Sequence, residues 1–130
     1  MEDPKTYTIT IAGVEYPLFF SSAVAEYIME HYRGLDEFVD AMKENSPAKQ
    51  LRIMLDVVRE LIKSGVMLER FKGHEVPQLP DNGMLPYLVD IHDLPTISNA
   101  IMQALSRGAA RTVEIAEDPK AKNMEATQGS

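Results

Sequence analysis

The three histidines of this 130-residue chain, His31, His74 and His92, are the first candidates for chemistry, because imidazole titrates near neutral pH and binds metals. Long stretches of sequence separate them. None belongs to an H-E-x-x-H motif or a comparable spacing of metal ligands. The histidines therefore do not predict a shared metal site.

Residues 90–93, Asp-Ile-His-Asp, are the one place where carboxylates stand on both sides of a histidine. Such a group can hold a hard cation or tune the imidazole. It can equally be the polar start of a helix, with Asp93 or Thr96 as the cap. Short motifs often arise by chance, so we favour the helix start and keep an enzyme or metal protein as the alternative.

No other nucleophile or phosphate loop stands out. The chain has no cysteine, which excludes disulfides, thiolate ligands and a cysteine nucleophile. No G-x-S-x-G, Walker or G-x-G-x-x-G motif is present. Carboxylates such as Asp56 are expected to form solvated helix-surface pairs, here with Arg59 three residues on. We predict no catalytic residue, no cofactor and no metal, and an enzyme is the least favoured class.

The composition is that of an acidic globular chain, with 45% hydrophobic and 25% charged residues and a net charge of −7. Lysine and arginine are scattered singly, so nucleic-acid binding is not expected. The acidity favours either solubility alone or an acidic adaptor that keeps an aggregation-prone partner in solution. A DNA mimic is disfavoured, because the acids are dispersed among bases.

The sequence also argues against an exported or membrane-spanning protein. The N-terminus has no apolar signal region, and no apolar run approaches the roughly 18 residues of a membrane span. We expect a cytoplasmic protein.

The N-terminal residues 6–20 have the pattern of a β-hairpin. Apolar residues alternate with polar ones, and the two strands meet at Gly13, where glycine accepts a positive φ. Pro17 indicates an edge strand or an amide position that points outward. Because an isolated hairpin is only marginally stable, this one must pack on helices, find a third strand or pair with another subunit. The apolar positions are Tyr7, Ile9, Ile11, Tyr16, Leu18 and Phe20.

Apolar residues then recur at helical spacing, and we predict helices over residues 22–33, 36–44, 47–64 and 95–107. Ser21 or Ser22 is the expected cap of the first helix, and Gly34 its stop. The fold class is α+β, mostly α-helical: the hairpin packs on a bundle of about four to five helices. We expect residues 1–111 to form a single domain and residues 112–130 to form a flexible tail.

The third helix has the clearest signals. Ser46 caps it, Pro47 takes the first helical position, and Gly65 closes it, although residues 66–73 are an alternative extension. Its apolar positions cover more than half the circumference. Such a helix is either central in the core, which is commoner, or covered by a partner.

Two features leave more than one interpretation. Residues 87–95 fit either a short helical turn or a strand, after a loop that contains three prolines and an Asn-Gly pair. The eight methionines are either core filler, the favoured interpretation, or part of an adaptable binding surface.

The order of these features resembles the phage tail assembly chaperones, small proteins encoded just before the tape measure protein of long-tailed phages and prophages. Gly13, Tyr16, Leu18 and Phe20 match the hairpin pattern G-x-x-Y-x-L-x-F of that family. The helix that follows ends at Tyr32-Arg33-Gly34, and a later helix ends in A-L-x-x-G at residues 104–108. The resemblance covers most of residues 6–110, and Val14-Glu15 after the turn departs from it.

The resemblance implies a non-enzymatic protein that binds and solubilises the tape measure protein and helps to recruit tail tube subunits. It also implies a place in the host cytoplasm and absence from the mature virion. Many families add a longer, frameshifted form. The runner-up is another small phage structural or adaptor protein, such as a head–tail connector or tail completion component.

We predict that the partner surface combines the hairpin face with the first two helices. The hairpin edge also offers self-association by strand addition. The predicted partner-binding residues are Tyr16, Leu18, Phe20, Tyr27, Phe38 and Met42.

Overall fold

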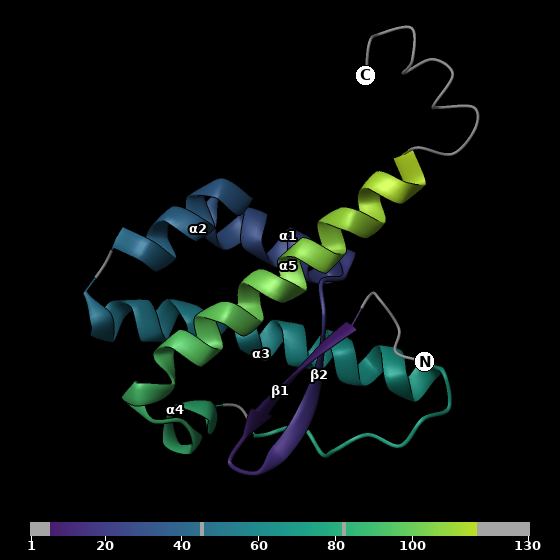
Figure 1. The fold of residues 1–130 in the computed structure, drawn as a ribbon, viewed down its shortest axis with the longest axis horizontal. Helices are drawn as coiled ribbons and strands as arrows, with labels where there is room; N and C mark the ends of the chain where they lie inside the picture. The colour runs from purple at the N-terminus through teal and green to yellow at the C-terminus, as the bar shows by residue number, and fades with distance from the viewer. Residues whose placement is uncertain (1–5, 45, 82, 117–130) are drawn as a thin grey trace, which may run out of the picture.

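The computed structural model describes residues 6–44, 46–81 and 83–116, which form an N-terminal hairpin followed by helices (Figure 1). The predicted α+β, mostly α-helical class is confirmed. The elements are β1 (Thr6–Ile11), β2 (Val14–Phe19), α1 (Ser22–Tyr32), α2 (Leu35–Glu44), α3 (Pro47–Phe71), α4 (Leu85–Leu88), the 3-10 helix η1 (Ile91–Asp93) and α5 (Leu94–Ala116).

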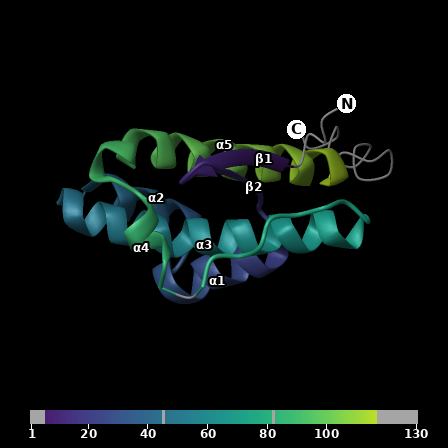
Figure 2. The ribbon, with the colours of Figure 1, turned by 90° about the horizontal axis from the view of Figure 1, so that it is seen from below.

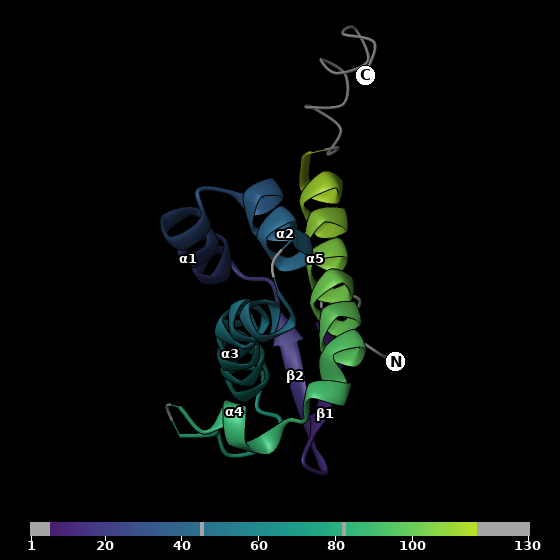
Figure 3. The same cartoon turned by 90° about the vertical axis from the view of Figure 1, so that its left-hand side faces the viewer.

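The hairpin lies between α3 and α5 (Figures 2 and 3). Strand β2 packs on α3 and β1 on α5, whereas α1 and α2 pack on α3. Because α3 touches nearly every other element, the long apolar helix is central in the core, as favoured from the sequence. Buried side chains of both strands and of α1, α2, α3 and α5 form one hydrophobic cluster.

The two strands are antiparallel and joined by a two-residue turn, Ala12-Gly13. Both turn residues have positive φ, 51° and 82°, as a type I′ turn requires. The turn fixes a register in which Ile9 faces Tyr16. These two side chains are buried together, so one face of the hairpin belongs to the core.

Pro17 pairs with Thr8 in this register. In a hairpin with a two-residue turn, hydrogen-bonded residue pairs alternate with non-hydrogen-bonded pairs from the turn outward. Pro17 belongs to a non-hydrogen-bonded pair, so a backbone N–H at this position would point away from β1, toward α3. The proline removes a donor that would have no partner there.

Helix α3 runs to Phe71, so the predicted end at residue 64 is wrong and the alternative extension is right as far as residue 71. Gly65 is buried inside the helix. A β-carbon there would collide with the carbonyl group of Pro17. The glycine marks a close approach of strand to helix and not a stop.

Two other helix ends differ from the prediction. Helix α1 ends in a left-handed residue, as expected, but that residue is Arg33, with φ 77°, and not Gly34. Helix α5 passes Gly108 and ends at Ala116, so the predicted helix end at residue 107 is wrong. The rest of the predicted tail, residues 117–130, lies outside the described residues.

The helix starts agree better with the sequence. The Ser21 hydroxyl accepts a hydrogen bond from the Val24 amide and lies 2.7 Å from the Ser64 hydroxyl, which ties the start of α1 to α3. Ser46 caps α3, with Pro47 in its first turn. The polar start near residues 90–93 is also present, but its cap is Asp90 and not Asp93 or Thr96.

Candidate functional site

The predicted partner surface is largely inside the protein. Phe38 and Leu18 have no exposed surface, and Met42 and Tyr16 are 2% and 5% exposed. In this conformation these four side chains belong to the core, and a partner would reach them only in another conformation; their assignment as partner-binding residues stays a prediction. Phe20 and Tyr27 are partly exposed.

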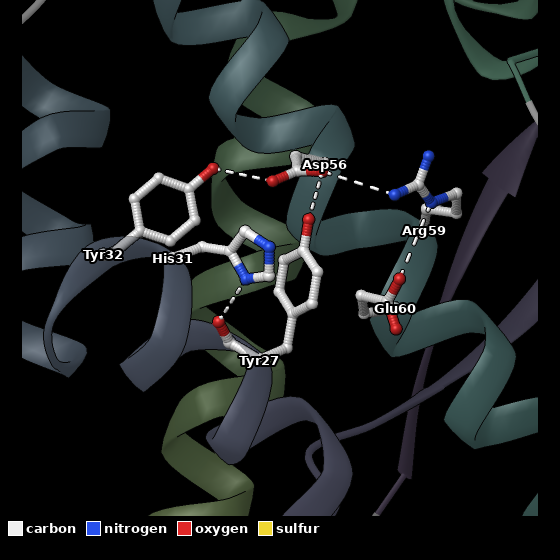
Figure 4. Close-up of polar contacts among 6 residues, drawn as sticks. All are labelled: Tyr27, His31, Tyr32, Asp56, Arg59 and Glu60. Carbon is white, nitrogen blue, oxygen red and sulfur yellow. Dashed lines mark hydrogen bonds and ion pairs between the residues drawn. The ribbon is translucent and has the colours of Figure 1, made fainter.

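Asp56, in the middle of α3, instead connects α3 with α1 (Figure 4). The hydroxyl of Tyr27 donates to its Oδ1 atom at 2.6 Å, and the hydroxyl of Tyr32 donates to its Oδ2 atom at 2.8 Å. Arg59 lies 3.4 Å from Oδ1. The expected solvated pair of Asp56 with Arg59 therefore exists, but the carboxylate mainly holds two tyrosines of α1 against α3.

The environment raises the pKa of both tyrosines, so that they stay protonated to higher pH than a free tyrosine. Burial, and then the hydrogen bond to Asp56, raise the pKa of Tyr27 to about 12. The same causes, in the same order, raise the pKa of Tyr32 well above its usual value. These hydroxyls act as hydrogen-bond donors, and a raised pKa is the opposite of what a tyrosine base or nucleophile needs.

The histidines stay apart in space as in sequence. His31 stacks on the Tyr27 ring, with centroids 3.9 Å apart, and its Nδ1 atom donates to the Tyr27 carbonyl. His74 contacts Glu69 at 2.6 Å. In the described part of the chain, no three histidine or carboxylate side chains are grouped to hold a metal ion.

His92 belongs to the cap of η1. Its amide and its Nδ1 atom each lie 2.8 Å from the Oδ1 atom of Asp90, while Asp93 accepts from the Asp90 amide. The hydrogen bond from the His92 amide, followed by that from its ring, lowers the pKa of Asp90. The geometry of residues 90–93 is therefore that of a capping box.

A cleft of about 580 Å³ opens beside the Asp56 network, between α3, the end of α1 and the start of α4. Its floor is apolar and includes Ile53, Leu55 and Leu85, which are buried. Its rim is exposed and includes Ala48 and Arg52. We call this feature the α3 cleft; it is lined by Tyr32, Ala48, Leu51, Arg52, Ile53, Leu55, Asp56, Arg59, Gly83, Leu85 and Pro86.

A second cavity of about 360 Å³ continues along α3 and shares Arg59 and Leu85 with the α3 cleft. It reaches Lys63 on α3 and Leu79 and Pro80 on the loop before α4. The two cavities together follow α3 from Ala48 to Lys63. At 1.5 Å per residue this is a groove of about 22 Å.

Sequence reasoning missed both the Asp56 network and the cleft. Tyr27 and Tyr32 were visible as helix residues, and Asp56 as a polar residue near an apolar stripe. Their meeting depends on how α1 crosses α3. The wall formed by Leu85 and Pro86 depends on how the loop after α3 returns along that helix.

Neither a protein-family model, nor a curated protein, nor a solved structure matches the chain. Among the described residues, no helix combines the length and the hydrophobicity needed to cross a bilayer.

Proposed function

We propose that this protein is a non-enzymatic tail assembly chaperone that binds and solubilises the tape measure protein and helps to recruit tail tube subunits, in the cytoplasm of a bacterial host. The observation that carries the proposal is the α3 cleft, an open groove with an apolar floor on the central helix. Grooves of this kind accept the apolar face of a helix. The hairpin motif of the sequence supports the same family.

The chemistry of the surface supports a solubilising role. A holdase has to cover apolar segments of its partner and keep the complex in solution. The cleft supplies apolar contact, and the net charge of −7 opposes aggregation. The chain offers further apolar surface on α3, where Phe71 is 88% and Met67 56% exposed, one helical turn apart.

Co-expression tests the proposal directly. The tape measure protein encoded with this chain is produced alone and together with it, and the soluble fraction is measured after centrifugation. We expect the tape measure protein to be insoluble alone and to co-purify with this chain when both are present. An equally insoluble tape measure protein in both cases would contradict the proposal.

The runner-up, a head–tail connector or tail completion component, is retained in the particle. Mass spectrometry of purified virions separates the two functions. We expect tube and tape measure peptides without peptides of this chain, and stoichiometric amounts of this chain would favour the structural component.

A further inference from the structure

The cations of α3 gather on one side of the helix. Lys49, Arg52, Arg59, Lys63 and Arg70 are spaced by three, seven, four and seven residues, which places all five within about 100° of the helical circumference. Of these, Arg52, Arg59 and Lys63 line the two cavities. Three cations thus form a strip along the apolar groove, which the carboxylates Asp56 and Glu60 of α3 also line.

The carboxylates within this strip are already engaged. Asp56 accepts from two tyrosines and lies beside Arg59, while Glu60 lies 3.7 Å from the Nε atom of Arg59. Arg52 and Lys63 are exposed, and the described residues give neither of them an ion pair. Two cations therefore remain to interact with groups from outside.

We propose that the α3 cleft and its continuation bind an acidic amphipathic helix of a partner protein. Apolar side chains of that helix enter the two cavities, and its carboxylates pair with Arg52 and Lys63. The groove of about 22 Å matches roughly four turns of helix, which suits anchors at i, i+3 or i+4 and i+7. The inference rests on the proposed function for the helical nature of the partner, and the charge of the partner helix follows from the strip.

The floor of the groove argues for a protein partner over a nucleic acid. Ile53, Leu55 and Leu85 offer apolar contact, and among the described residues that line the two cavities Tyr32 is the single aromatic side chain on which a base could stack. Asp81 also faces the second cavity and disfavours phosphates and carboxylates alike, so the preference for an acidic helix comes from Arg52 and Lys63.

Two designed helical peptides of 21 residues test the charge preference. They share one apolar face of leucine and phenylalanine, and their polar faces carry glutamate in one and lysine in the other. Binding of each labelled peptide is followed by fluorescence anisotropy at low and at physiological salt. We expect the acidic peptide to bind about fivefold more tightly or better, a preference that falls as salt rises.

The variant R52E/K63E changes two exposed side chains and leaves the core intact. We expect it to lose the preference for the acidic peptide and to bind the basic one more tightly. The matched control R70E makes the same kind of charge change on an exposed residue of the same side of α3, seven residues beyond Lys63 and outside both cavities. We expect R70E to bind like the unmodified protein. In L51Q, which makes the cleft wall polar, both peptides are expected to bind more weakly.

Equal binding of the two peptides, or the same preference in R52E/K63E as in the unmodified protein, would overturn the inference. The inference would also be overturned if a 20-nucleotide single-stranded DNA displaced the acidic peptide from the unmodified protein and this competition were lost in R52E/K63E. The co-expression assay keeps the two proposals apart. If the unmodified chain does not solubilise the tape measure protein, the proposed function fails. If it does and R52E/K63E is equally effective, only the inference fails.

Discussion

Gly65 of α3 lies directly against the carbonyl group of Pro17 in β2, with no room between them for a β-carbon. This contact sets how closely the hairpin approaches the central helix. It also explains why two residues that usually interrupt regular structure stand inside a helix and a strand. The glycine has no β-carbon to collide with the strand, and the proline lacks the outward N–H that would have no hydrogen-bond partner.

Gly65→Ala is therefore expected to destabilise the protein. In an unconstrained helix the same change stabilises by about 1 kcal/mol, so the sign of the effect is informative. Here the added methyl group must push β2 away from α3, and we expect a loss of about 1–3 kcal/mol in the free energy of unfolding. Urea denaturation measures it. Lys63→Ala, on the exposed side of the same helix, is the control and should stay within about 0.5 kcal/mol. A more stable Gly65→Ala variant would contradict the close contact.

Removing either tyrosine hydroxyl from the Asp56 network should loosen α1. Tyr27→Phe and Tyr32→Phe each delete one hydrogen bond to a partly exposed carboxylate. We expect each variant to lose about 1 kcal/mol of stability, at the low end for a charged acceptor. Tyr87→Phe is the matched control, because Tyr87 is 84% exposed. Equal stability of all three variants would show that the network contributes nothing measurable.

The same network predicts a pH dependence on the alkaline side. The folded-state pKa of Tyr27 is raised from 10.0 to about 12, so the interaction contributes fully below pH 10 and is lost as the pH rises through 12. The stability difference between the unmodified protein and Tyr27→Phe should therefore shrink over that range. Chemical denaturation at stepwise pH gives the difference. Phenolate absorbance should show Tyr27 and Tyr32 ionising at higher pH than a free tyrosine. A constant stability difference across this range would contradict the assignment.

Core substitutions separate folding from binding. Leu18→Ala and Phe38→Ala remove fully buried side chains, and we expect each to cost about 2–5 kcal/mol of stability. The folded fraction of either variant should bind the acidic peptide with unchanged affinity, since neither side chain lines the cavities. Anisotropy measured at a temperature where both variants are folded checks this. A loss of peptide binding without a loss of stability would indicate that Leu18 and Phe38 belong to the partner-binding surface.

Local chemistry made much of the fold predictable. The type I′ turn needs a residue such as Gly13, the starts of α1 and α3 need a side-chain acceptor such as Ser21 or Ser46, and Pro47 fits only the first turn of a helix. These signals act over a few residues, so the sequence displays them in full. A glycine gave a wrong prediction where it is required by a contact with a distant part of the chain. Gly65 looks like a helix stop unless Pro17 is known to lie against it.

The sequence by itself determined that this is an acidic, cysteine-free chain with a hairpin, a set of amphipathic helices and one helix apolar over most of its circumference. Only the tertiary structure decided which apolar residues are available to a partner. Leu18 and Phe38 share the apolar chemistry of Leu51, yet they are buried while Leu51 lines an open cleft. Periodicity shows which face of an element is apolar, but what covers that face depends on contacts between segments far apart in the chain. For the same reason, Asp56 became the anchor of two tyrosines only when α1 packed on α3.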